Sequence, residues 1–168
     1  MPNWVQNRLS ISGPPADIDR FVAVASTMTR STSKHGPPVA QTGKGKPVAD
    51  NRSFCPEILA FQHFIPMPRK FAKSLPKGYP GTPRWMMWRA KYWGTKWDAS
   101  WPEVKRVYRT RVRYWFSTPW DAPIEWLERV SRKYATLVFT LRYRRDGEWQ
   151  LPCVLRKGKF REVRKLKG

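Results

Sequence analysis

The sequence of 168 residues contains little of what metal sites and disulfide frameworks require. It has two cysteines, two histidines and twelve acidic residues. Cys55 and Cys153 lie far apart and form no Cys-x-x-Cys pair, so neither a zinc cage nor a disulfide framework is indicated, and we expect both to be reduced and buried. No segment contains the roughly 18 apolar residues that span a bilayer, and the N-terminus lacks a signal-peptide pattern. The sequence therefore predicts a cytoplasmic protein that makes no membrane contact.

Few residues suggest catalysis. His35 lies in a polar segment and His63 in an apolar run, so the two are not expected to form an acid-base pair. Asp98 and Asp121 occupy equivalent Trp-Asp-Ala contexts, where capping of a turn is a simpler role than magnesium binding for nuclease chemistry. Lys44 and Lys46 lie between glycines but lack the spacing of a phosphate-binding loop. We predict no enzymatic activity, no metal and no cofactor.

Positive charge is what the sequence has in excess. The 33 lysines and arginines against 12 acidic residues give a formal net charge of +21, which solubility alone does not explain. From Arg84 onward the net charge is +14, against +7 before it. A polyanion would relieve the self-repulsion, and phosphate neutralisation releases counterions, so nucleic acid is the expected class of partner.

Hydrophobic periodicity predicts three strands and three helices in the first 143 residues. The strands are residues 4–12, 104–116 and 136–143, and the helices are residues 17–26, 84–93 and those that follow Pro123. Gly94 is expected to end the second helix. Asp146 and Gly147 are expected to form a hairpin turn into a further strand, residues 149–155.

Two segments lack such periodicity. Residues 27–52 are rich in Ser, Thr, Gly, Pro and Lys, and are predicted to be a long flexible insertion after the first helix. Residues 156–168 are predicted to be a basic C-terminal tail, leaving residues 1–155 as one domain. Whether the tail binds a partner or only adds solubility is open at this stage.

Five blocks of sequence resemble those of a known family. They are Met1–Trp4, Asn7–Gly13, Phe64–Pro68, Tyr92–Ala99 and Phe116–Pro123. Together they resemble the YubB ferredoxin-like family of small phage and plasmid proteins, over residues 1 to about 150. The resemblance implies a ferredoxin-like sheet with helices on one face and an origin in a mobile element, and it implies no established reaction. The family tends to have Tyr-x-Glu-x-Gly near its last strand, whereas residues 143–147 here read Tyr-Arg-Arg-Asp-Gly, so a basic residue replaces an acidic one.

Pattern and resemblance together predict an α+β protein, a ferredoxin-like split β-α-β two-layer sandwich with an antiparallel sheet. In such a fold the strand residues that point away from the helices share an uncovered face. Arginine suits that face because its planar guanidinium pairs with phosphate and stacks on bases, although exposed arginines also solubilise a strand. The predicted binding residues are Arg8, Arg109, Arg111, Arg113, Arg142, Arg144, Arg145, Arg156, Lys157, Lys159, Arg161, Arg164 and Lys165.

The ten tryptophans divide into two groups. Most of Trp85, Trp88, Trp93, Trp97, Trp120 and Trp126 are expected in the core, because helical spacing and turn context account for them. The candidates for base stacking are Trp4, Trp101, Trp115 and Trp149. With guanidinium groups at the centre of the face, we expect mainly phosphate contacts and weak sequence specificity.

The leading prediction is a non-enzymatic phage or mobile-element protein that binds RNA, DNA or a ribonucleoprotein in the bacterial cytoplasm. The alternative is an inhibitor of host machinery, such as an anti-CRISPR-like anti-defence protein, whose basic surface docks on an acidic host protein. Both functions use the same arginines. The oligomeric state is left open.

Overall fold

The computed structural model describes residues 3–26, 58–71, 81–150 and 152–162. In chain order the elements are β1 (Trp4–Ser12), α1 (Pro15–Ala25), α2 (Phe61–Phe64), the short 3-10 helix η1 (Arg69–Phe71), α3 (Arg84–Trp93), β2 (Ser100–Tyr108), β3 (Arg111–Pro119), α4 (Ile124–Lys133), β4 (Val138–Arg145), β5 (Glu148–Trp149), β6 (Cys153–Arg156) and β7 (Lys159–Glu162). The predicted insertion at residues 27–52 lies outside the described residues.

One antiparallel sheet organises the chain. Its strands run in the order β2-β3-β1-β4-β6-β7, and β5 pairs with β4. The central order β2-β3-β1-β4, with α1 after β1 and α4 after β3, is the split β-α-β arrangement. The α+β ferredoxin-like prediction is therefore confirmed.

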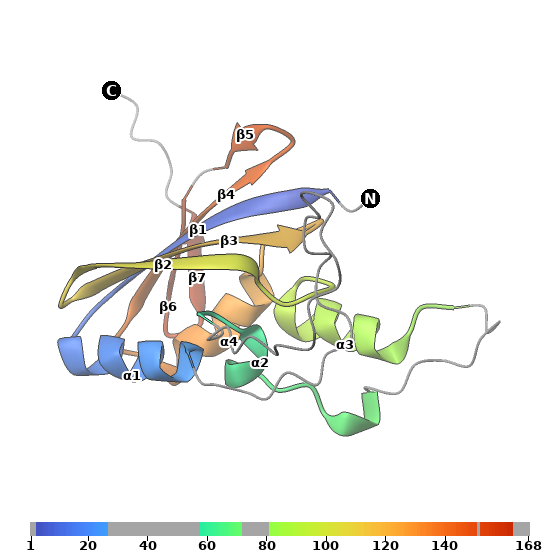
Figure 1. Ribbon diagram of the computed structural model, residues 1–168, viewed down its shortest axis with the longest axis horizontal. Coiled ribbons are helices and arrows are strands. Elements are labelled where there is room, and N and C mark those ends of the chain that lie inside the picture. The colour runs from blue at the N-terminus through green and yellow to red at the C-terminus, as the bar shows by residue number, and fades with distance from the viewer. Residues whose placement is uncertain (1–2, 27–57, 72–80, 151, 163–168) are drawn as a thin grey trace, which may run out of the picture.

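The helices cover one face of the sheet (Figure 1). In α1 the apolar residues Ile18, Phe21 and Ala25 recur at helical spacing and are buried. They share one core with the inward side chains of the sheet, including Val5, Leu9 and Ile11 of β1, which alternate with outward polar residues. Because of this alternation, one face of the sheet packs against the helices and the other is exposed to solvent.

An aromatic cluster joins α2, α3 and α4 beneath the sheet. The Phe61 ring lies 4.5 Å from the Trp126 ring and 6.0 Å from the Trp93 ring, measured between centroids. Helix α3 ends as predicted at Gly94, whose φ of 77° is left-handed and suits glycine. Tertiary packing rather than length stabilises the four-residue α2, because a helix this short is unstable alone.

The prediction of one strand over residues 104–116 is wrong. The chain turns at Arg109 and Thr110, and β2 pairs back on β3 with Tyr108 opposite Arg111. The segment contains no Gly, Pro or Asn to mark a turn, so its alternation reads as continuous. The turn removes Arg109 from the strand face where the sequence analysis placed it.

The predicted boundary at residue 155 is also wrong. Arg156 belongs to β6, and residues 159–162 form β7, which pairs with β6 at the edge of the sheet. Lys157 and Gly158 have φ of 53° and 73°, as a tight hairpin turn requires. The described part of the basic tail therefore extends the sheet.

Candidate nucleic-acid interface

The face of the sheet that points away from the helices is defined by strand register. Arg8 on β1 lies between Trp115 on β3 and Arg142 on β4, and Glu103 on β2 lies opposite Trp115. The neighbouring residues of each strand, such as Leu9 and Tyr114, are buried against the helices. We call this surface, formed by the outward residues of all the strands, the open face.

The open face is strongly basic. Among the described strand residues it has nine basic side chains and one acidic side chain, Glu103. The nine are Arg8, Lys105, Arg111, Arg113, Arg142, Arg144, Arg156, Lys159 and Arg161. Of these, only Arg113 is partly buried. Most of the cations are thus accessible to a ligand that approaches the sheet.

Trp149 adds an aromatic ring to this surface. The turn at Asp146 and Gly147 folds β5 back, so that Trp149 pairs with Arg144. The guanidinium carbons of Arg8 and Arg142 lie 5.1 and 5.9 Å from the Trp149 ring centroid, within cation-π range. Trp149 is 42% exposed, so the ring of this predicted stacking residue is accessible.

Trp4 and Trp101 pack together at the end of β1. Their ring centroids are 4.8 Å apart in a T-shaped contact. The strand β2 is irregular between Ser100 and Glu103, and Trp101 there has a φ of 49°, which is uncommon for a residue other than glycine. Trp101 is 56% exposed. This irregularity places an indole at the margin of the open face.

A groove of about 650 Å³ crosses the open face. It is lined by Gln6, Asn7, Arg8, Trp101, Glu103, Val104, Lys105, Trp115, Phe116, Ser117 and Trp149. Three tryptophans and two cations therefore border one hollow, although they come from four strands. Trp4, the fourth predicted stacking residue, contacts Trp101 beside the groove.

Several predicted binding residues lie elsewhere. Arg109 is in the β2–β3 turn, where its carbonyl oxygen accepts a hydrogen bond from Arg106. Arg145 forms an ion pair with Asp121, so its charge is already partnered. Lys157 is in the β6–β7 turn, and Arg164 and Lys165 lie outside the described residues.

Two charged residues of the open face were not among the residues predicted from sequence. Glu103 and Lys105 point outward from β2 opposite Trp115 and Arg113. The alternation in residues 100–108 is a usable signal, since Glu103 and Lys105 are two residues apart. The alternation in residues 100–108 was overlooked because residues 104–116 were predicted to form a single strand.

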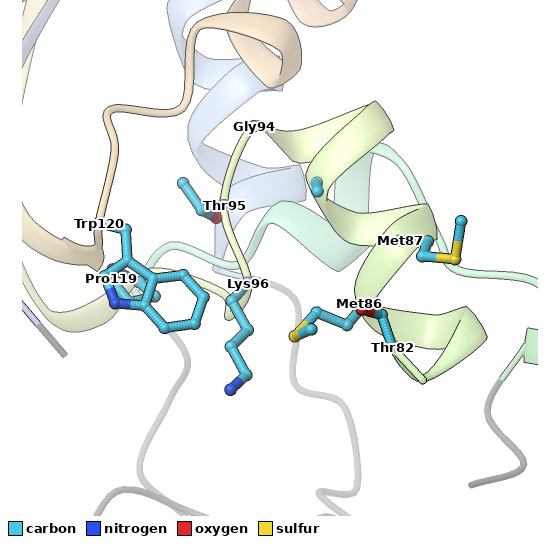
Figure 2. Close-up of a pocket in the computed structure, with 9 residues that line it drawn as sticks. Thr82, Met86, Met87, Gly94, Thr95, Lys96, Pro119 and Trp120 are labelled. Carbon is cyan, nitrogen blue, oxygen red and sulfur yellow. The ribbon is translucent and has the colours of Figure 1, made fainter. Parts of the chain in front are cut away.

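A second, smaller hollow lies outside the open face, between α3 and the end of β3 (Figure 2). Its volume is about 250 Å³, and Met86, Met87, Lys96 and Trp120 line it. The Lys96 ammonium lies 4.8 Å from the Trp120 ring centroid. Of the six tryptophans that were expected to lie mostly in the core, three are buried (Trp88, Trp93 and Trp126), two are partly buried (Trp85 and Trp97), and Trp120 is 51% exposed.

The two Trp-Asp-Ala aspartates act as caps, as predicted. Asp98 accepts hydrogen bonds from the backbone N–H groups of Phe61, Gln62 and Ala99, at 2.5, 3.1 and 2.7 Å. Asp121 accepts one from Ala122 at 2.8 Å. Burial raises the pKa of the Asp98 carboxyl, whereas the three backbone donors and Arg89 oppose that shift.

Other titratable residues occupy structural positions. The Nδ1 atom of His63 lies 3.2 Å from the carbonyl oxygen of Ala25, and Cys153 is buried as expected. In the part of the chain that the structure describes, no group of three or more His, Cys, Asp or Glu side chains is arranged to hold a metal ion.

Tyr114 lies on β3 directly beneath the open face. Its side chain is buried, and its hydroxyl has no hydrogen-bond partner among the described residues. Burial raises the pKa of Tyr114 well above its ordinary value, although the charge of Arg106 opposes the shift. The protonated form is therefore the one that the folded state favours.

The pKa of Tyr114 is higher in the folded state than in the unfolded state, where it is about 10. The free energy of unfolding is therefore unaffected by its ionisation below about pH 10 and falls as pH rises above that value. We expect Tyr114→Phe to change the free energy of unfolding by less than about 1 kcal/mol at neutral pH, since the lost hydroxyl is unpaired. At about pH 11 the variant should be more stable than the parent. Urea unfolding at both pH values tests this, with the exposed Tyr108→Phe as control. Equal alkaline losses in Tyr114→Phe and the parent would contradict it.

Comparison with known proteins agrees with the fold. Residues 96–152 match a family model described as the ferredoxin-like domain in Api92-like protein. The match covers β2, β3, α4, β4 and β5, which carry most of the groove. The fold is also similar to that of a solved structure, protein api92 from Yersinia pseudotuberculosis, with a TM-score of 0.65 and 11% identity over 100% of both chains. No curated protein matches the chain.

At 11% identity, the similarity to the Yersinia protein supports the fold alone. The ferredoxin-like architecture implied by the sequence motifs is thereby confirmed. The family model that residues 96–152 match is described as Api92-like, and the match does not confirm the YubB family. No helix among the described residues is both long and apolar enough to cross a membrane.

Proposed function

We propose that this protein binds nucleic acid on the open face of its sheet. The observation that carries the proposal is the charge of this surface: nine basic side chains and one acidic side chain among its described strand residues. A phosphate backbone neutralises such a surface and releases condensed counterions when it binds. Guanidinium groups pair with phosphate through two parallel hydrogen bonds, and seven of the nine are arginines.

The exposed rings on the same surface favour nucleic acid over a purely solubilising role. Trp115, Arg8 and Arg142 form a row across three adjacent strands, whose spacing is about 4.8 Å. A ring beside two cations suits a single strand, whose bases stack on rings while its phosphates pair with cations. A row of arginines that only solubilised the strands would not need tryptophans beside it.

The proposed function also includes the mode of action, the cellular location and the origin of the protein. We propose that the chain acts by binding rather than by catalysis, in the cytoplasm of a bacterium, and that it originates in a phage or other mobile element of the YubB type. The ligand would be RNA, DNA or a complex that contains one of them. An inhibitor of host machinery that docks on an acidic host protein would use the same cations, and the binding experiment separates the two functions.

The first test is binding of the purified protein to labelled single-stranded and double-stranded oligonucleotides of DNA and RNA across a salt series. With about five phosphate contacts to a single strand, the logarithm of the association constant should fall with the logarithm of salt concentration with a slope of about −3.5. Affinity should also rise with oligonucleotide length until the open face is filled. Absence of binding at about 50 mM salt, together with recovery of one host protein from a lysate, would overturn this function and support the inhibitor.

A further inference from the structure

One carboxylate on the open face opposes phosphate binding. Glu103 is the single acidic side chain among the described strand residues of this face, and it lines the 650 Å³ groove. Its cross-strand neighbour is Trp115, and it takes part in none of the ion pairs between described residues. A carboxylate at that position repels phosphate, so its presence is accounted for if it accepts hydrogen bonds from another part of the ligand.

The groove has the dimensions and walls of a base-binding site. Its volume of about 650 Å³ lies within the range of small-ligand sites. Trp101, Trp115 and Trp149 line the groove and provide rings on which a base can stack. Arg8 and Lys105 add hydrogen-bond donors beside the Glu103 acceptor.

We propose that this groove binds a guanine base of a single-stranded nucleic acid, with Glu103 as the residue that selects guanine. The inference rests on the proposed function and specifies its ligand. Guanine carries two donors on its Watson–Crick edge, N1–H and the N2 amino group, and a carboxylate accepts both at once. Its O6 and N7 atoms are acceptors that pair with arginine or lysine, and Arg8 and Lys105 line the same groove.

The other bases fit this set of groups less well. Adenine and cytosine each present one amino donor to a carboxylate, and the single imide N–H of uracil or thymine lies between two carbonyl oxygens that Glu103 would repel. In a duplex, base faces are stacked and Watson–Crick edges are paired, so the site requires a single strand. A guanine site modifies the weak sequence specificity that was expected from the sequence. Phosphate contacts would still dominate the affinity, and the protein would select the base at one position of the bound strand.

The test uses oligonucleotides of about 12 nucleotides, oligo(dT) and oligo(U), each with one central guanine, adenine or cytosine or with no substitution. The parent protein should prefer the guanine-containing strands by about tenfold. Glu103→Gln should reduce this preference to less than about twofold while still binding the unsubstituted strands. The DNA and RNA arms show which sugar the site accepts.

Glu128→Gln is the matched control, because it removes the same charge from α4 on the opposite side of the sheet. It should leave the guanine preference unchanged. If the parent binds all strands equally, or if Glu103→Gln keeps the full preference, the guanine site is overturned and the proposed function stands. If no strand binds, the proposed function fails and the guanine site fails with it.

Discussion

Replacing Arg8, Arg113 and Arg142 with alanine is expected to weaken single-stranded nucleic-acid binding by about 10²- to 10³-fold at moderate salt. Each arginine would contribute about 1–1.5 kcal/mol as a charge-assisted contact, and 1.4 kcal/mol corresponds to a factor of ten. With oligo(dT), which has no guanine for Arg8 to contact, the salt slope should flatten by about 2, since each lost phosphate contact accounts for about 0.7. Fluorescence anisotropy across a salt series measures both quantities.

The three arginines are chosen from the structure. They lie on β1, β3 and β4 at the centre of the open face, whereas Arg109 lies in a turn and Arg145 is paired with Asp121. None of the three forms an ion pair between described residues, so their removal leaves no carboxylate without a partner. The fold is therefore expected to persist, which a thermal melt verifies.

The control replaces Lys70, Arg84 and Lys91, which are exposed residues of η1 and α3 on the helix layer. This variant loses the same three charges but none from the open face. Its affinity is expected to fall by less than about tenfold, because long-range attraction alone is screened over about 10 Å. Equal losses in the two variants would show that net charge, rather than the open face, determines binding.

Asp98→Ala is expected to lower the free energy of unfolding by about 3–4 kcal/mol. Three backbone N–H groups donate to its carboxylate, two of them from the first turn of α2. Loss of that carboxylate leaves the three donors unsatisfied. Burial lowers the pKa of Arg89, and the variant also loses the negative charge of Asp98 that favours the protonated guanidinium. Because α2 carries Phe61 into the aromatic cluster, its detachment would also loosen the core.

Asp121→Ala is the matched comparison, since it removes the same residue from the same tripeptide. Asp121 has a 55% exposed side chain and accepts one backbone N–H and the Arg145 guanidinium. Its loss should lower the free energy of unfolding by about 1 kcal/mol, because water replaces its partners. Asp98→Asn, which keeps one acceptor oxygen, should fall between the two alanine variants. Urea unfolding curves measure all three, and equal losses at the two positions would contradict this account.

The sequence determined the layers of this protein. Alternation in β1 and β4 and helical spacing in α1 and α4 specify which side of each element is apolar, and burial of apolar surface requires those sides to meet. The +21 charge follows from composition, and the outward positions of the strand arginines follow from the same alternation. The sequence also predicted the helix end at Gly94 and the turn at Gly147, because glycine readily adopts the positive φ found at both positions.

Tertiary structure decided where the charges and rings meet. The β2–β3 turn carries no Gly, Pro or Asn, so only strand pairing shows that β2 folds back and adds Glu103 and Lys105 to the open face. Strand pairing likewise converts part of the basic tail into β7. Trp149 lies beside Arg8 although 141 residues separate them in the chain. Such contacts depend on register between distant strands, which local periodicity does not encode.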